Sequence, residues 1–206
     1  EKYNLRVVED SAQALGSKFD GKYAGTFGDS AAISFYPAKV LGCFGDGGAI
    51  ITNSETQYNK VFQLHDHGRD IHGEIVSWGR NSRLDNINAA ILDYKLKSYM
   101  KDISYRREIA KLYDERLSFL EELKLPPCPV EDGINYDIFQ NYELMADQRD
   151  ELKQFLFDNG IGTLIQWSGK AIHQWEKLGF GVVLPKVEEF FKKCIMLPMN
   201  TFISEN

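Results

Sequence analysis

Lys39 stands where a lysine side chain can act as a nucleophile. It follows a short apolar run, Ala31–Phe35, and precedes a loop and a second apolar run, Ala49–Thr52. The loop is rich in glycine, with Gly42, Gly45, Gly47 and Gly48. Short apolar runs bounded by Gly and Pro are typical of buried strands, so we expect Lys39 at the rim of a buried sheet. An amine that loses water there is a stronger nucleophile near neutral pH. The alternative is a solvated lysine on a surface loop, as most lysines are.

A carboxylate, an amide and a hydroxyl accompany this lysine. Asp10 follows a β-rich run, Leu5–Glu9, and Ser34 lies at the end of the run that precedes Lys39. Open α/β sheets bind ligands at the carboxyl ends of their strands, although an Asp in this position more commonly caps a turn. Gln13 returns to the side of Asp10 if the intervening residues form a helical turn, and otherwise faces solvent.

Pyridoxal 5'-phosphate is the cofactor that needs this set of groups. Its aldehyde requires a lysine, which Lys39 supplies, and its ring nitrogen requires a carboxylate to stay protonated, which Asp10 supplies. Its phosphate requires hydroxyl and amide donors, and Ser34 is placed to be one of them. The residues therefore predict a site for this cofactor at the edge of the first sheet.

Composition and charge exclude several other classes of protein. The 206-residue chain carries a net charge of -6, whereas nucleic-acid-binding proteins have a basic footprint. The three cysteines, Cys43, Cys128 and Cys194, form neither a zinc spacing nor a disulfide framework, which fits a reducing cytoplasm. No apolar run is long enough for a membrane span. We expect both ends of the chain to be cut.

A histidine-rich stretch invites a metal-binding interpretation. His65, Asp66, His67 and His72 are residue types that suit Zn²⁺. The first three are adjacent at the expected end of a helix, however, and alternate residues on a helix point apart. We therefore prefer a helix C-terminus at which histidine complements the helix dipole, and we predict no metal.

The remaining pattern predicts a domain of α/β type followed by a smaller α+β domain. The predicted boundary gives domains 1–105 and 106–206, the second incomplete at its end. Phe19–Asp29 is expected to form plain turns or a hairpin-like excursion. The predicted helices are Glu55–His65 with Ser54 as its cap, a long helix from Asn86 to Leu123 with a kink near Lys101-Asp102, Gln148–Asn159 with Gly160 as its C-cap, and Pro185–Lys193. The predicted later strands are Gly48–Thr52, Tyr136–Met145 and Gly162–Trp167, and a short apolar segment, Ile195–Leu197, follows the last helix.

Several ordered segments resemble the DegT/DnrJ/EryC1/StrS family of pyridoxal-phosphate-dependent nucleotide-sugar aminotransferases. The segments that carry the resemblance are VVEDSAQALGS (Val7–Ser17), Gly28–Asn53, His67-Gly68, GRNSRLDNINAAIL (Gly79–Leu92) and Leu184–Ser204. The resemblance implies the fold of aspartate aminotransferase (fold type I), with part of the large-domain sheet and most of the small domain. By the same resemblance, the first half of the large domain precedes residue 1, so the isolated fragment would be weakly active or inactive.

The resemblance also implies a role for each site residue. Lys39 matches the lysine that binds the cofactor as an imine and shuttles the proton, and Asp10 matches the aspartate paired with the pyridine nitrogen. Gln13 matches the glutamine near the ring hydroxyl, and Ser34 matches a phosphate-binding serine. Asn81 matches an asparagine that reaches the phosphate of the partner subunit's cofactor, which implies a homodimer.

A substrate contact is implied less directly. His173 lies where many members have a histidine near the sugar, although the surrounding QWSGKAIHQW departs from the usual pattern. The alternative is a loop residue packed beside Trp175.

The implied activity is cytoplasmic transfer of an amino group from glutamate to a nucleotide-linked keto sugar, in polysaccharide or glycoside biosynthesis. No nucleic acid or membrane partner is predicted. A sugar dehydratase of the same family is one rival, but such members typically carry His where Lys39 stands. The other rivals are a non-catalytic partner subunit that retains the fold and an unrelated open α/β binding domain.

Overall fold

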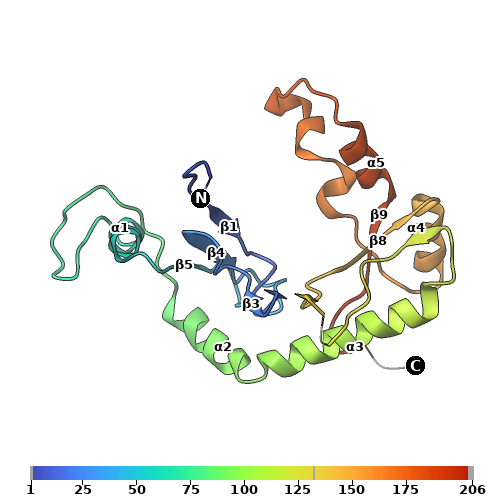
Figure 1. Ribbon diagram of the computed structural model, residues 1–206, viewed down its shortest axis with the longest axis horizontal. Coiled ribbons are helices and arrows are strands. Elements are labelled where there is room, and N and C mark those ends of the chain that lie inside the picture. The colour runs from blue at the N-terminus through green and yellow to red at the C-terminus, as the bar shows by residue number, and fades with distance from the viewer. Residues whose placement is uncertain (1, 132, 204–206) are drawn as a thin grey trace. The chain divides into compact units, whose positions relative to one another are not determined.

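A computed structural model describes residues 2–131 and 133–203. Its contacts divide the chain into two compact units. The first contains the residues up to Ser104 together with Val130–Gln140, and the second contains Tyr105–Pro129 and the residues from Asn141 onward. Figure 1 shows the elements in chain order. The chain thus returns once to the first unit before it completes the second.

The central sheet of the first unit has the strand order β1-β4-β5. Its strands are β1 (Val8–Asp10), β4 (Ser30–Ser34) and β5 (Gly48–Thr52). β1 runs parallel to β4, whereas β5 is antiparallel to β4. The first strand starts later than predicted because its partner β4 begins opposite Val8, and the preceding Val7 N–H donates to the Asp29 side chain instead. The strand predicted over Ala31–Phe35 is observed one residue earlier, as Ser30–Ser34. Its pairing begins where Ser30 lies opposite Val8 and ends where Ser34 lies opposite Gly48.

A hairpin follows the first strand, as one of the two expected forms of Phe19–Asp29. β2 (Lys18–Phe19) and β3 (Lys22–Tyr23) pair antiparallel around Asp20 and Gly21, which both have positive φ. An Asp-Gly pair favours such a two-residue turn because glycine adopts positive φ without strain. The hairpin also pairs with β7 (Asn135–Tyr136), far along the chain.

The first helix is confirmed at both ends, but the long predicted helix is wrong in its continuity and in its end, which is Leu117 rather than Leu123. α1 (Glu55–His65) is capped by the Ser54 side chain, which accepts from the Gln57 N–H. The long helix is two, α2 (Asn86–Leu96) and α3 (Tyr99–Leu117). They separate at Ser98, whose Oγ donates to the Lys95 carbonyl at 3.2 Å and lies 3.3 Å from Asp102 Oδ2. A serine that bonds to local backbone in this way competes with the helix, so the interruption comes before the predicted kink.

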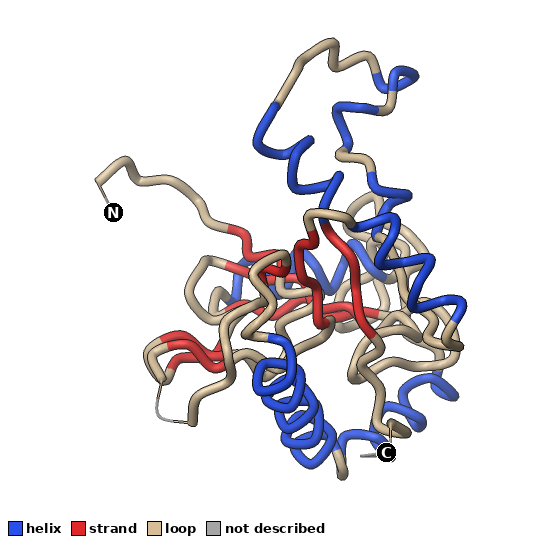
Figure 2. The backbone as a smooth tube through the Cα atoms, turned by 90° about the vertical axis from the view of Figure 1, so that its right-hand side faces the viewer, coloured by secondary structure: helices blue, strands red, loops and turns tan. Residues whose placement is uncertain are grey.

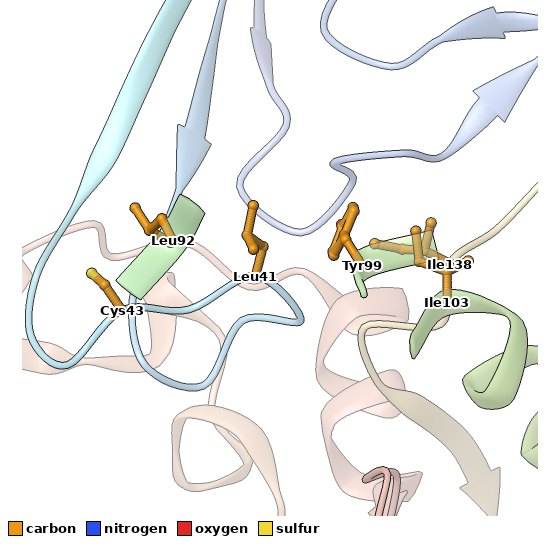
Figure 3. Packing of buried hydrophobic residues seen from close by; sticks show 6 residues of the cluster. All are labelled: Leu41, Cys43, Leu92, Tyr99, Ile103 and Ile138. Carbon is orange, nitrogen blue, oxygen red and sulfur yellow. The ribbon is translucent and has the colours of Figure 1, made fainter. Parts of the chain in front are cut away.

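The core of the first unit lies between the glycine-rich loop and these helices. Figure 3 shows six side chains of its main cluster, contributed by the loop after β4, by α2, by α3 and by the segment after β7: Leu41, Cys43, Leu92, Tyr99, Ile103 and Ile138. Ile103 is completely buried and Ile138 is 1% exposed. The loop that carries Lys39 is therefore anchored in the core just past the lysine.

The second unit is built on a sheet of order β6-β8-β9, antiparallel throughout. Its elements are β6 (Leu123–Lys124), β8 (Tyr142–Ala146), α4 (Arg149–Asp158), the short 3-10 helices η1 (Gln166–Gly169), η2 (Ile172–Gln174) and η3 (Glu176–Leu178), α5 (Pro185–Lys193) and β9 (Cys194–Leu197). Figure 2 colours the helices, strands and connecting loops of the chain by type. The predicted α5 is confirmed at both ends, and α4 agrees to one residue at each end.

Two predicted strands are wrong. Tyr136–Met145 is interrupted because Phe139 has φ of 50° and its N–H donates to Asp137 Oδ1, which turns the chain between β7 and β8. Gly162–Trp167 contains an isolated bridge from Leu164 to Met196, after which Trp167 adopts φ of 50°. The family-like C-terminal segment extends to Ser204, which lies outside the described residues.

Among the described helices, none combines the length and the apolar character needed to cross a lipid bilayer.

Candidate functional site

The parallel pairing of β1 with β4 brings two predicted site residues to one edge of the sheet. Asp10 pairs with Ala32, and Ser34 lies two residues further along the same strand. Both strands end there, β1 at Asp10 and β4 at Ser34. Because side chains alternate along a strand, Asp10, Ala32 and Ser34 project from the same face of the sheet.

The two faces of this sheet differ in exposure. The face that carries Asp10 is open: Val8 is 71% exposed and Ile50 is 55% exposed. The opposite face carries Ala31, which is 1% exposed. A cavity of about 260 Å³ lies on the open face, lined by Val8, Ala32, Ile50 and neighbouring residues of α1. Asp10 and Ser34 thus stand at the end of an accessible apolar band.

The carboxylate of Asp10 is exposed, and Oδ1 accepts a hydrogen bond from the Ala12 N–H at 3.1 Å. Through this bond Asp10 caps the turn that follows β1, as aspartates in this position commonly do. The residues after Asp10 form two turns, closed by Ala14 N–H to Ser11 C=O and by Ser17 N–H to Ala14 C=O, rather than the helical turn considered for Gln13. Gln13 itself is exposed.

Lys39 follows Ser34 in a turn at the end of β4. The Ser34 Oγ accepts from the Tyr36 N–H at 3.2 Å, which leaves the hydroxyl proton to be donated elsewhere. The Lys39 N–H donates to the Tyr36 carbonyl at 2.8 Å. The sequence left two alternatives for Lys39, a lysine that loses water and a solvated lysine on a surface loop. The residue is partly buried, which lies between the two.

Long-range contacts fix the loop after Lys39, and sequence reasoning missed the residues that make them. Gln140 bonds to the backbone at Ala38 and Val40, and the Lys95 ammonium donates to the Gly42 carbonyl at 2.6 Å. Buried Asn88 accepts from the backbone of the same loop. These partners lie tens of residues away in the sequence, so no local spacing signals them.

Glu9 was also missed, although it adjoins Asp10. Its carboxylate faces the opposite side of β1 and accepts backbone N–H groups from Gly25 at 2.7 Å and from Phe27 and Gly28 at 2.6 Å each. Burial raises the pKa of the Glu9 carboxyl, but these three hydrogen bonds outweigh it, and the pKa lies below its ordinary value. The sequence signal available for Glu9 was a polar residue in a short strand, followed by a loop rich in glycine that it could face.

Asn81 lies apart from Asp10, Ser34 and Lys39, in the segment between α1 and α2. Its backbone pairs with Asp66, and the chain between them doubles back as a hairpin that extends beyond α1 in Figure 1. Asn81 is exposed, and within the described chain no hydrogen bond joins it to the other three residues.

The base of this hairpin is held by a backbone crossing and an ion pair. A Cβ added at Gly68 would lie 1.7 Å from the Ser77 carbonyl oxygen, so only glycine fits there. Asp66 contacts the guanidinium of Arg83. Burial raises the pKa of the Asp66 carboxyl, but the Arg83 hydrogen bond and the charges of Arg83 and Arg69 lower it below its ordinary value.

The histidines divide between the two units. His65 ends α1, as predicted, and its Nδ1 contacts the Phe62 carbonyl. In the described part of the chain, no three His, Cys, Asp or Glu side chains are grouped as metal ligands would be. His173, in η2 of the second unit, is buried with Nε2 3.1 Å from Glu188 Oε1. The Leu184 N–H and His173 both hold the pKa of the Glu188 carboxyl below its ordinary value, so His173 ties η2 to α5.

The groups of the first unit fit pyridoxal phosphate in kind and in order. An exposed carboxylate and a hydroxyl with a free proton end adjacent strands on one open face, and an amine follows in the next turn. This chemistry is that of a lysine-bound aldehyde with a protonated ring nitrogen and a phosphate.

Comparison with known proteins supplies an independent finding. The profile of the DegT/DnrJ/EryC1/StrS aminotransferase family matches residues 1–206. The chain is 37% identical to a protein of Geobacillus stearothermophilus named "Pleiotropic regulatory protein", with 100% of this chain and 56% of the relative covered. It is 34% identical to the dTDP-3-amino-3,4,6-trideoxy-alpha-D-glucose transaminase of Micromonospora megalomicea, with 97% of this chain and 54% of the relative covered.

A solved structure agrees with the sequence comparison. A DegT DnrJ EryC1 StrS aminotransferase from Brucella abortus superposes with a TM-score of 0.88 at 35% identity, covering 99% of this chain and 54% of that chain. The chain therefore spans about half the length of the relatives it matches, and the predicted fold type is confirmed.

The crossing at the base of the hairpin predicts different effects for two glycines. Gly68 and Gly73 have φ of +82° and +85°, but an added Cβ meets nothing within 4 Å at Gly73. G73A should cost about 1–2 kcal/mol of unfolding free energy for the left-handed backbone alone. G68A should cost clearly more, measured by urea denaturation of the full-length protein; equal costs would contradict the crossing.

The Glu9 hydrogen bonds predict a pH dependence of stability. Because the pKa of Glu9 is lowered in the folded state, its contribution is present above the pKa of the unfolded chain and is lost as the pH falls through the folded pKa. E9Q should therefore be less stable than wild type near neutral pH, and the difference should shrink toward acid. Denaturation at several pH values tests this, with exposed Glu74 as the control in E74Q. A difference independent of pH would refute it.

Proposed function

Because the chain belongs to the DegT/DnrJ/EryC1/StrS aminotransferase family, we propose that the full-length protein is a sugar aminotransferase. It transfers an amino group from glutamate to a keto group of a nucleotide-linked deoxysugar, with pyridoxal 5'-phosphate as cofactor. The product serves the biosynthesis of a surface polysaccharide or a glycoside. The relative from Micromonospora megalomicea, a dTDP-amino-sugar transaminase by name, supports this substrate class.

One observation of the structure carries the proposal. Asp10 and Ser34 end adjacent parallel strands on one open face, and Lys39 lies in the turn that follows. A carboxylate, a hydroxyl and an amine in this arrangement are the groups that a phosphorylated pyridine aldehyde requires. A general binding domain has no need of all three together.

Each of four residues of the first unit has a defined task in this proposal. When bound, the cofactor supplies an electron sink for the carbanion that forms at the carbon losing its proton. Lys39 attaches the cofactor through its amine and, when released, moves a proton between substrate and cofactor carbons. Asp10 keeps the ring nitrogen protonated, Gln13 lies near the ring hydroxyl, and Ser34 donates to the phosphate.

The proposal includes a homodimer in which Asn81 contacts the phosphate of the partner subunit's cofactor. Asn81 is exposed and lies at the base of a hairpin apart from Lys39. That hairpin exposes large apolar side chains, among them Trp78, which is 96% exposed, and Ile71 and Ile75, at 73% and 72%. Such a patch is typical of a protein–protein contact, and it supports a dimer built through this segment.

Two further assignments belong to the proposal. In the second unit, His173 contacts the sugar substrate, and Glu188 fixes the orientation of its imidazole. The enzyme is placed in the cytoplasm, because Cys43, Cys128 and Cys194 are all free thiols, a state that reducing compartments maintain.

A non-catalytic regulatory role is the second candidate. The Geobacillus relative is named a pleiotropic regulatory protein, and it covers this whole chain at 37% identity. The presence of Lys39 favours the aminotransferase over both this role and the related sugar dehydratase. Attachment of the cofactor to Lys39 is therefore the deciding measurement.

The lysine assignment predicts a single site of covalent attachment. Full-length protein is incubated with pyridoxal phosphate, reduced with borohydride and digested, and the modified peptide is identified by mass spectrometry. We expect the label on Lys39 and none in K39A, whereas K97A, which alters an exposed lysine of the same unit, should retain it. Labelling of another lysine at the same stoichiometry would overturn the assignment.

The homodimer predicts complementation between two variants. In a symmetric dimer, mixing K39A with N81A subunits gives mixed dimers with one native site, because each site takes Lys39 from one subunit and Asn81 from the other. Equal random mixing should restore about a quarter of wild-type sites, measured as aminotransferase activity with glutamate and a panel of nucleotide 3-keto and 4-keto sugars. No gain over the separate variants would mean that both residues act within one subunit.

A further inference from the structure

The side-chain amide of Gln140 bonds to the backbone on both sides of Lys39. Its Nε2 donates to the Ala38 carbonyl at 2.8 Å, and its Oε1 accepts from the Val40 N–H at 2.9 Å. Both ends of the amide are used, so the network itself fixes which end is oxygen and which is nitrogen. The lysine is the one residue between these two bonded positions.

The peptide groups on either side of Lys39 are held by bonds different from those that hold the rest of the loop, where Lys95 and Asn88 bond to Gly42 and Phe44. Lys39 lies in a turn after β4, outside every ladder of the sheet, and its N–H bond to the Tyr36 carbonyl closes that turn. With the two bonds from Gln140, the peptide groups before and after Lys39 are both held. The direction of the Lys39 Cα–Cβ bond is thereby set, and the region that its amine can reach is limited.

Gln140 is itself held by buried neighbours. Ile138 and Phe139, which precede it, are 1% and 3% exposed. The Phe139 N–H donates to Asp137 Oδ1 at 2.9 Å, which fixes the turn. Ile138 also shares the core cluster with Leu41, two residues beyond Lys39. The amide therefore extends from a rigid base that is packed into the same core as the lysine loop.

We propose that Gln140 is a positioning residue for Lys39, whose amine it holds in place at the edge formed by Asp10 and Ser34. The inference rests on the proposed function, since it gives Lys39 a reaction to perform. Preorganisation of a reacting group matters because a misplacement of about 1 Å can cost a rate on the order of 100-fold. A flexible four-carbon side chain on an unfixed turn would lose much of that advantage.

Two variants separate positioning from general support. Q140E keeps an acceptor for the Val40 N–H but cannot donate to the Ala38 carbonyl. Q140N keeps the amide but shortens the side chain, so it cannot reach both partners. Q154N is the matched control, because Gln154 makes its side-chain bond to Asp158 on the surface of α4.

The experiment uses the full-length protein and three readouts. These are the rate at which the cofactor-free protein forms the borohydride-trapped pyridoxal phosphate adduct on Lys39, the kinetic constants with glutamate and a keto sugar, and the melting temperature. We expect Q140E and Q140N to lower both the attachment rate and kcat by about 10- to 100-fold. The KM for the sugar should stay within about threefold, and the melting temperature should match that of Q154N.

The outcomes distinguish this inference from the proposed function. If wild-type protein labels Lys39 and both Gln140 variants match its attachment rate and kcat, the positioning role is refuted while the proposed function stands. If the variants lose stability but the folded fraction reacts at the wild-type rate, Gln140 is merely structural and the inference fails. If wild-type protein takes no cofactor on Lys39, the proposed function fails first.

Discussion

The parallel pairing of β1 with β4 is the constraint on which the candidate site depends. The register that sets Asp10 opposite Ala32 also sets Ser34 at the adjoining strand end and on the same face. A slip of one residue would turn Asp10 to the opposite face and move Glu9 to the open one. Because the Glu9 carboxylate accepts three backbone N–H groups behind the sheet, such a slip would break those bonds as well. The Glu9 carboxylate thus reinforces the register that places Asp10 on the open face.

The two adjacent acidic residues show how alternation along a strand separates stability from chemistry. Glu9 faces the loop that contains Gly25 and Gly28, and its oxygens are occupied by backbone donors. Asp10 faces the open side, where Ala12 contributes one hydrogen bond to Oδ1. A carboxylate with several fixed donors stays ionised and inert, whereas an exposed one can take a ligand's proton-bearing nitrogen. Two neighbouring carboxylates of one strand therefore differ in surroundings: that of Glu9 is occupied by backbone donors, and that of Asp10 faces the open side.

Sequence patterns predicted the elements with strong local signals. The period of α1 together with its Ser54 cap, and the proline-initiated α5, gave the correct bounds. The long helix failed at Ser98, where a side-chain bond to the Lys95 carbonyl competes with helix continuity. Apolar periodicity cannot report such a bond, because the pattern continues across the break. The strand predicted over Tyr136–Met145 failed for a related reason, since Phe139 adopts a left-handed conformation that its residue type does not suggest.

The residues of the candidate site divide in the same way, into those with a local sequence signal and those without one. Asp10, Ser34 and Lys39 were predicted as site residues because each lies at a strand end or in the turn after one, where spacing carries information. Gln140 was missed because its partners, Ala38 and Val40, lie a hundred residues away in the sequence. The turn after β4 supplies the lysine, and the Gln140 side chain holds the peptide groups on both sides of it. Motifs therefore predict candidate reacting groups, whereas the contacts that fix the backbone around Lys39 come from a distant residue that no motif contains.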